Sequence, residues 1–296
     1  MRIDFYGVRG SLPSPGPATA SFGGNTSCVH VELASGAQLI FDAGTGLRNL
    51  GTRLAATTTP LCLLLTHSHW DHIQGFPFFQ PIYQPEREIH ICRSLPEQDA
   101  VHSGLLEQLN GHNFPLTPDL LPAAISDIAD PLAYFGRRDF GFARKALNHP
   151  GGGYAYRIDE DGASFAYVTD NELDPPGAVA TTFGEWVDFC TGVDVLVHDA
   201  QYIASDMPHK HGWGHSLVSD VRRLALEAGA GCLVLYHHDP GRTDLEVAMI
   251  LDESRAWFSR QHSQTQVLCA WEGLSVGIER TSGGRTRLDI NALRPD

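Results

Sequence analysis

The sequence predicts an α/β protein in which two β-sheets pack face to face with helices outside them, a four-layer αββα sandwich. Two observations lead to this fold class. Short apolar runs typical of buried strands come first in hairpin-like groups and then alternate with stretches of helical length. This order occurs in two roughly equivalent halves, so that each half supplies one sheet and its covering helices.

The expected elements follow this order along the chain. In the first half they are strands at 2–7, 28–33, 38–42, 61–66 and 88–92, and helices at 46–56 and 96–109. In the second half they are strands at 153–158, 163–169, 193–198, 232–236, 266–270 and 274–279, and helices at 216–228 and 244–260. Residues 111–135 are punctuated by proline and are expected to be irregular. We expect one domain over residues 1–296.

Composition and charge exclude several classes of protein. Lys and Arg total 21 against 35 Asp and Glu, a formal net charge of −14, so a nucleic-acid polymer is a disfavoured partner. A small anionic substrate stays compatible, because bound metal ions would dominate the local field. No apolar run approaches the roughly 20 residues that span a bilayer. The six scattered cysteines predict buried free thiols and a cytoplasmic protein.

The most informative segment is the one from His67 to His72, directly after the apolar run 61–65. It holds three histidines and an aspartate within six residues. Alternation along an extended backbone points His67 and His69 the same way, and Asp71 and His72 follow in the turn. Imidazole and carboxylate are the ligands that divalent metals such as zinc prefer, so the segment predicts a metal site.

Further histidines and aspartates stand where later strands end. His149 precedes a glycine-rich turn, Asp170 ends one strand, Asp199 ends another after His198, and the pair His237-His238 ends a third. Residues at strand ends leave the core for a cleft, and the repetition of this pattern favours a shared site.

These residues together resemble the metallo-β-lactamase-fold hydrolases. The segment 67–72 fits the HxHxDH motif of that family, and the segments 7–13, 23–28 and 41–46 are similar to its phosphodiesterase branch, which includes ribonuclease Z and small cyclic-phosphodiester hydrolases. The resemblance covers nearly the whole chain and implies the same αββα fold. It also implies that 111–135 is an insertion on the substrate side, which either caps the active site or forms a homodimer contact.

The resemblance implies two metal ions and a ligand for each position around them. The first ion would be held by His67, His69 and His149, and the second by Asp71, His72 and His237, with Asp170 bridging both. His238 is the competitor for the role of His237. Zinc is the expected metal, with manganese and iron as alternatives.

Two more residues match elements of the ribonuclease Z-like branch. His215 is expected to contact the phosphate or act as general acid, and Asp199 to orient it, so that Asp71, His215 and Asp199 are the expected catalytic residues. At position 199 this chain has Asp where the branch usually has Glu, and at position 217 it has Leu where the branch usually has Thr. The alternative is that Asp199 and His215 only cap a strand end and a helix.

Residues around the motif have expected supporting roles. Asp42 would accept a hydrogen bond from a ligand histidine, with stabilisation of a turn as an equal alternative. Trp70 and the aromatic residues of 76–79 are expected to pack under the metal loop, and base stacking is the alternative. The loop 209–214 would lie beside the site.

The sequence therefore predicts a dinuclear metal-dependent hydrolase, a phosphodiesterase acting on a small phosphodiester such as a cyclic nucleotide. One alternative is hydrolysis of a lactone, thioester or lactam on the same fold. The other is a metal-binding regulatory protein without turnover.

Overall fold

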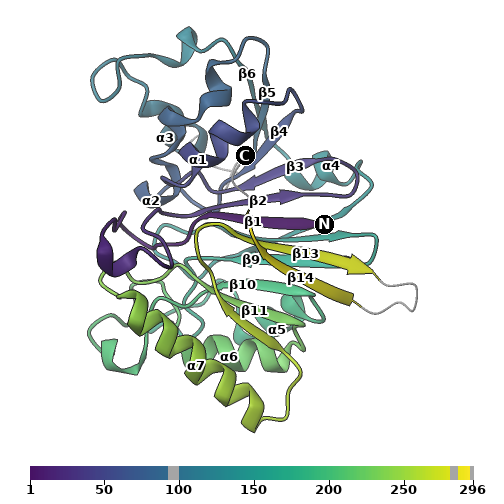
Figure 1. Ribbon diagram of the computed structural model, residues 1–296. Coiled ribbons are helices and arrows are strands. Elements are labelled where there is room, and N and C mark those ends of the chain that lie inside the picture. The colour runs from purple at the N-terminus through teal and green to yellow at the C-terminus, as the bar shows by residue number, and fades with distance from the viewer. Residues whose placement is uncertain (93–99, 281–285, 294–296) are drawn as a thin grey trace.

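The two predicted sheets are present in the computed structural model, which describes residues 1–92, 100–280 and 286–293 (Figure 1). Within these residues the first sheet has the strand order β14 (Thr286–Ala292), β13 (Leu274–Arg280), β1 (Arg2–Gly7), β2 (Cys28–Glu32), β3 (Gln38–Phe41), β4 (Leu61–Leu64), β5 (Glu88–Cys92) and β6 (Ala124–Ile128). The second has the order β12 (Gln266–Cys269), β11 (Cys232–Tyr236), β10 (Val195–Asp199), β9 (Ala163–Val168), β8 (Tyr154–Glu160) and β7 (Gly141–Ala146).

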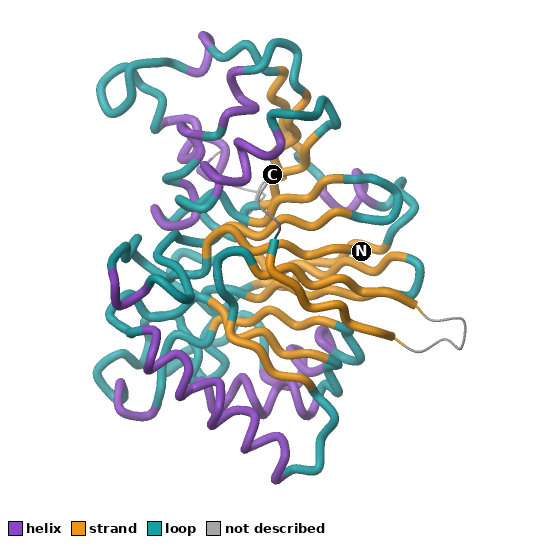
Figure 2. The backbone as a smooth tube through the Cα atoms, in the orientation of Figure 1, coloured by secondary structure: helices purple, strands orange, loops and turns teal. Residues whose placement is uncertain are grey.

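The helices lie outside the sheets, which occupy the middle of the molecule (Figure 2). The helices of the described residues are α1 (Leu47–Leu54), α2 (Trp70–Ile73), α3 (Ala100–Glu107), α4 (Pro131–Phe135), α5 (Phe183–Cys190), α6 (Val218–Glu227) and α7 (Asp244–Arg260). Helices α1 and α3 lie beside the first sheet, and α5, α6 and α7 lie beside the second (Figure 1). Part of the helix expected at 96–109 is α3, and residues 93–99 lie outside the described residues.

Three apolar clusters separate the four layers. The first lies between the sheets and includes Phe41 of β3 and Phe165 of β9, whose ring centroids are 5.4 Å apart. A second joins the outer face of the second sheet to α5, α6 and α7, and contains the fully buried Trp186. A third joins the first sheet to α1, α3 and the turns after α2. Burial on both faces explains why the central strands read as continuous apolar runs.

Local sequence signals set where two of the helices begin. At the start of α7, Thr243 Oγ1 accepts a hydrogen bond from the backbone N–H of Glu246, whose carboxylate accepts from the N–H of Thr243 in return. Thr182 and Glu185 form the same reciprocal pair before α5. Each pair satisfies backbone donors that a helix start would otherwise leave free.

The structure adds elements that the sequence reasoning did not place. Residues 111–135, expected to be irregular, contain β6 and α4, and β6 pairs in parallel with β5 at the edge of the first sheet. The strands β7 and β14 and helix α5 were also not predicted. The strands β6 and β14 lie at sheet edges, where alternating half-exposed residues give a weaker apolar signal than the central runs.

The predicted absence of a membrane span and the predicted free thiols can be compared with the structure. Among the described residues, no helix combines the length and apolar character needed to cross a bilayer. None of the six cysteines, all of which lie in the described residues, forms a disulfide; five are buried and Cys62 is half-buried.

Strand direction brings the polar strand ends together. Strands β3 to β6 run parallel to one another in the first sheet, and β9 to β12 do so in the second. The carboxyl ends of parallel strands lie at one edge of a sheet, where ligands of α/β proteins bind. His67 follows β4, Asp170 follows β9, and His237 follows β11, so the fold places all three at such edges.

The core between the sheets yields a stability prediction. Phe165→Ala is expected to lower the free energy of unfolding by about 3–5 kcal/mol, because the ring is fully buried and its removal leaves a cavity. Leu245→Ala is the control, since this side chain is 71% exposed on α7 and should change stability by less than about 0.5 kcal/mol. Denaturant unfolding of both variants measures the difference. Equal losses would contradict the assignment of Phe165 to the core.

Candidate metal centre

The structure brings all seven predicted ligand residues into one cluster centred on Asp170. Two groups of possible ligand atoms match the predicted sets, one from His67, His69, His149 and Asp170 and the other from Asp71, His72, His237 and Asp170, and a further group joins Asp170 and His237 to Asp199 and His215. Within each group the atoms lie within 4.8 Å of one another. The two groups share Asp170, as the sequence analysis predicts for a bridging carboxylate.

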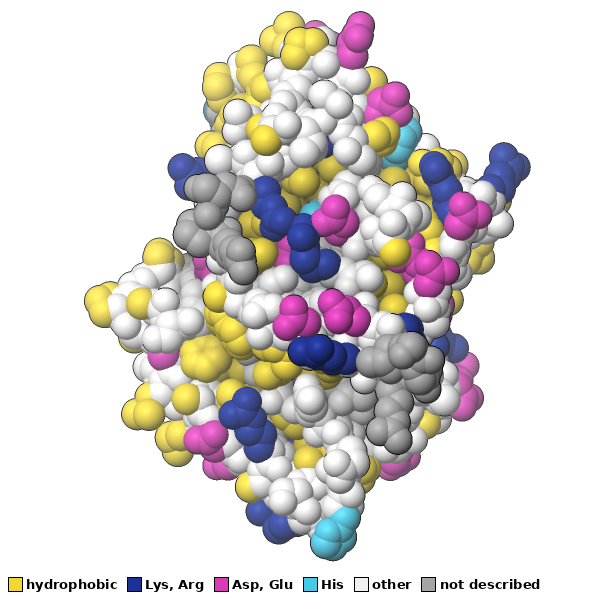
Figure 3. Space-filling view, turned by 45° about the vertical axis from the view of Figure 1, so that its right-hand side comes forward, with side chains coloured by type: hydrophobic (Ala, Val, Ile, Leu, Met, Phe, Trp, Pro, Cys, Tyr) yellow, Lys and Arg dark blue, Asp and Glu magenta, His cyan; other side chains and the backbone are white. Residues whose placement is uncertain are grey.

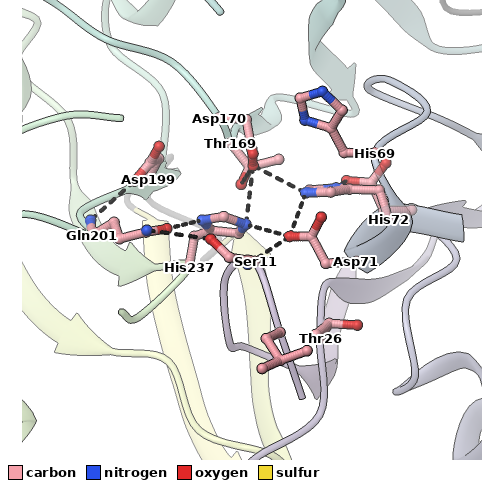
Figure 4. Close-up of polar contacts among 12 residues, drawn as sticks. Ser11, Thr26, His69, Asp71, His72, Thr169, Asp170, Asp199, Gln201 and His237 are labelled. Carbon is pink, nitrogen blue, oxygen red and sulfur yellow. Dashed lines mark hydrogen bonds and ion pairs between the residues drawn. The ribbon is translucent and has the colours of Figure 1, made fainter. Parts of the chain in front are cut away.

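The two oxygens of Asp170 face different groups. Oδ2 lies 3.6 Å from Nε2 of His67 and 3.7 Å from Nε2 of His149. Oδ1 lies 3.1 Å from Nε2 of His72 and 3.1 Å from Nε2 of His237. Figure 4 shows Asp170 above the space between His72 and His237, with Asp71 on the other side. One carboxylate therefore serves both groups.

The other ring nitrogens are held from outside the cluster. Nδ1 of His72 lies 2.9 Å from Oδ2 of Asp42, and Nδ1 of His237 lies 2.8 Å from Oε1 of Gln201. Nδ1 of His149 donates to the carbonyl oxygen of Gly214 at 2.9 Å. Such partners fix the orientation and tautomer of metal-binding histidines, and they leave Nε2 as the inward-facing atom. The expected contact between Asp42 and a ligand histidine is present.

The donor set fits divalent metal ions. The Nε2 atom of His67 is buried and has no hydrogen-bond partner among the described residues. Burial, together with the neighbouring His72, holds the pKa of His67 well below its ordinary value, so this ring is a neutral nitrogen donor. Buried imidazoles and carboxylates in this arrangement are the ligands that zinc and related ions prefer.

The carboxylates of the cluster stay ionised. Burial opposes the charged form of Asp170, but His237 and His72 outweigh it and hold its pKa well below the ordinary value. Asp71 behaves in the same way, with His72 as its main favourable neighbour. These carboxylate oxygens face the Nε2 atoms of the histidine rings, so that anionic and neutral donors together surround the place where a cation would bind.

The backbone is strained at three positions of the site. Asp42, Asp170 and His237 have φ values of 61°, 52° and 58°, in the left-handed region that favours glycine. Asp42 and His237 directly follow β3 and β11, and Asp170 stands two residues after the end of β9. Strain of this kind persists where the surrounding structure fixes it, and it concentrates at functional sites.

The structure separates His237 from its neighbour His238. His237 faces the cluster, whereas Nε2 of His238 donates to the carbonyl oxygen of Ala270 at 2.9 Å. Burial lowers the pKa of His238 to about 3, which keeps this ring neutral in the core. We propose His237 as the ligand, and with it the other predicted ligand positions.

His215 and Asp199 form a pair beside the cluster. Nδ1 of His215 lies 2.8 Å from Oδ2 of Asp199, and the ring stacks on His237 with centroids 5.1 Å apart. Burial opposes the charged form, but Asp199 outweighs it and raises the pKa of His215 to about 9. Asp199 Oδ1 also accepts from the backbone N–H of Gln201, which fixes the carboxylate. Asp199 therefore orients the His215 ring and favours its protonated form.

Three contacts of the site were not predicted from the sequence. Gln201 holds His237, the backbone N–H of Ser11 donates to Oδ2 of Asp71 at 2.7 Å, and the hydroxyl of Tyr167 donates to Oδ2 of Asp42 at 3.0 Å. Gln201 follows Asp199 by two residues, and Ser11 lies in the segment 7–13 that resembles the phosphodiesterase branch, so both stand near a recognised signal.

The expected packing of the aromatic residues is only partly correct. Phe76 and Phe79 are buried under the loop, as expected. Trp70 and Phe78 are 81% and 58% exposed, so the prediction that they pack under the loop is wrong. Helix α2 begins at Trp70 and buries Asp71 and His72, which leaves the indole of Trp70 facing solvent.

The cluster opens to solvent at one side. Most of its residues are buried, whereas His69 is exposed and His149 is half-buried. Nε2 of His149 lies 3.1 Å from Nδ1 of His69, so these two rings meet at the opening. In Figure 4 the ring of His69 stands apart from the network of contacts around His72 and Asp71.

Fold and site together define a metal-dependent hydrolase. Residues 38–238, more than half of the chain, match the family model described as the Beta-lactamase superfamily domain, and the chain belongs to this superfamily. The resemblance found in the sequence motifs is thereby confirmed, as is the fold class.

Curated relatives carry the name ribonuclease Z. The protein of Haloarcula marismortui is 23% identical over 321 residues, covering 94% of this chain and 97% of that protein. The protein of Gloeothece citriformis is 26% identical over 309 residues, covering 87% and 92% respectively. These names agree with the branch that the motifs resemble.

Solved structures share the fold at low sequence identity. The metallo-β-lactamase fold protein YhfI from Bacillus subtilis has a TM-score of 0.63 and 18% identity, covering 93% of this chain and 98% of that chain. Human tRNase Z, short form, has a TM-score of 0.61 and 18% identity, covering 94% and 99%. A diphosphatase from the PhnP family has a TM-score of 0.60 and 16% identity, covering 94% and 98%.

The neighbouring histidines give a matched test of the ligand proposal. His237→Asn is expected to remove at least one equivalent of bound metal, because it deletes an inward-facing nitrogen, whereas His238→Asn is expected to retain the wild-type metal content. Elemental analysis of the purified variants after dialysis gives the metal content. Loss of metal in His238→Asn with retention in His237→Asn would reverse the assignment.

Proposed function

We propose that the protein is a dinuclear metal-dependent phosphodiesterase that acts on a small phosphodiester such as a cyclic nucleotide. The observation that carries the proposal is the His215–Asp199 pair, held 2.8 Å apart beside the shared carboxylate of Asp170. Such a pair supplies an oriented proton donor next to a site suited to two cations, which is what cleavage of a phosphodiester with an alkoxide leaving group requires.

The proposed ligands divide between two ions. His67, His69 and His149 would hold one ion, and Asp71, His72 and His237 the other, with Asp170 between them. When bound, two divalent ions, zinc in this proposal, make a nucleophile available from water near neutral pH and offset the negative charge of the phosphate oxygens. The residues of the chain set the positions at which this chemistry takes place.

His215 has the geometry of a general acid. Its Nδ1–H is engaged by Asp199, so the transferable proton is on Nε2. Asp199 favours the imidazolium and keeps the ring in one orientation, because its own carboxylate is fixed by the N–H groups of Asn171 and Gln201. The Nε2 proton would pass to the departing oxygen as the bond from phosphorus to that oxygen breaks.

Charge and space support a small substrate. The net charge of −14 disfavours the binding of a long polyanionic substrate. On the face in Figure 3, lysine and arginine side chains are interspersed with aspartate and glutamate. His215 also lines a cavity of about 190 Å³, which has the size for a small leaving group.

A substrate panel tests the proposed activity. With added zinc or manganese the protein is expected to hydrolyse bis-p-nitrophenyl phosphate and cyclic nucleotides, and to leave a lactone and a thioester intact. A tRNA is included because relatives are named for ribonuclease activity. Absence of phosphodiester turnover would overturn the proposal, and preferred cleavage of the tRNA would overturn its assignment to a small substrate.

The role of His215 has its own test. His215→Ala is expected to lower kcat by roughly 10²- to 10⁴-fold, the usual contribution of a general acid, with unchanged metal content. The loss should be smaller for a p-nitrophenyl ester than for an alkyl ester, because p-nitrophenolate leaves without needing a proton. Equal losses for both esters would show that His215 does not act as the acid.

A further inference from the structure

A groove adjoins the opening of the metal centre. It has a volume of about 740 Å³, which lies within the range of small-molecule sites. Ser68 and Trp70 line one side of it, and these are the two chain neighbours of His69, the exposed member of the cluster. The groove therefore lies beside the loop that carries His69.

Aromatic rings form much of the groove. Trp70 and Phe78 line it and are 81% and 58% exposed, so their faces are available to a ligand. Phe114 packs edge-on against Phe78, with ring centroids 5.5 Å apart and an interplanar angle of 86°. Asn110 holds this part of the chain in place, because its side-chain oxygen accepts from the backbone N–H groups of His112 and Asn113.

The other lining groups are suited to an uncharged polar ligand. Side-chain amides of Gln74 and Asn113 line the groove and can donate and accept hydrogen bonds. Among the described residues that line it, Glu107 is the one charged side chain, and it is acidic. A phosphate is therefore disfavoured in the groove itself, whereas a planar ring with polar edges matches both the aromatic faces and the amides.

We infer that this groove binds the nucleobase of the substrate while its phosphodiester lies at the metal centre. The inference rests on the proposed function and narrows it to nucleoside-containing phosphodiesters. Trp70 stands next to His69 at the opening and is the stacking surface, with Phe78 and Phe114 forming the farther wall. Every nucleobase has a flat face that can stack on an aromatic side chain. The groove is therefore expected to favour substrates that contain a nucleobase, without distinguishing one base from another.

Two diesters with the same leaving group test the inference. Thymidine 5′-(p-nitrophenyl phosphate) and methyl p-nitrophenyl phosphate both release p-nitrophenolate when water cleaves the aryl ester bond, and they differ in the nucleoside. Trp70→Ala is expected to lower kcat/KM for the thymidine ester by roughly 5- to 140-fold, corresponding to about 1–3 kcal/mol of stacking, with little change for the methyl ester. Trp70→Phe should retain most of the preference.

Further variants keep the test independent of the metal motif. Phe78→Ala lies outside the motif and should also reduce the preference for the thymidine ester, whereas Leu245→Ala on α7 should leave it unchanged. The metal content of each variant is measured alongside. If Trp70→Ala and Phe78→Ala each lowered kcat/KM equally for the thymidine ester and the methyl ester, the assignment of the groove would be overturned, and the proposed function would stand. If the wild-type protein hydrolysed neither of the two esters, the proposed function itself would be overturned.

A second measurement compares how strongly two compounds that are not hydrolysed in the assay inhibit the protein. Adenosine 5′-monophosphate and ribose 5-phosphate share a sugar phosphate and differ in the base. The wild-type protein is expected to bind the nucleotide more tightly, and Phe78→Ala is expected to reduce that difference. Equal inhibition constants for the two compounds in the wild-type protein would overturn the inference.

Discussion

The carboxylate of Asp170 is the group on which the geometry of the site depends. Its two oxygens face separate sets of imidazoles, at 3.1 Å on one side and 3.6–3.7 Å on the other. Asp170 stands just beyond the end of β9, with its backbone in the left-handed region. There it meets His67, which follows β4 of the first sheet, and His237, which follows β11 of the second.

Much of the site could be predicted from the sequence, for a physical reason. Four of the proposed ligands lie within six residues, so local geometry alone brings them together. Asp170 and His237 follow apolar runs that are typical of strands, and parallel strands bring their carboxyl ends to a common edge. His149 was predicted from the glycine-rich turn that follows it, because the strand before it was not recognised. His237 and His238 were harder to separate, because alternation at a strand end depends on where the strand stops and the backbone turns.

The remaining features depend on contacts between distant segments. Gln201 and His237 are 36 residues apart, and Ser11 and Asp71 are 60 apart, so no local pattern links them. The exposure of Trp70 depends on where α2 begins, because the start of the helix decides which of its residues face inward. Strand β6 was missed because its pairing with β5 at a sheet edge, rather than a strong apolar run, stabilises it.

The cluster draws its residues from both halves of the sandwich. His67, His69, Asp71 and His72 follow β4 of the first sheet, whereas Asp170, His215 and His237 come from segments that flank strands of the second. An ion held by such a set is a cross-link between the halves, and its binding free energy adds to the free energy of folding. Occupancy of the centre and cohesion of the two sheets would therefore be thermodynamically linked, so metal binding would raise the free energy of unfolding as well as supply the chemistry.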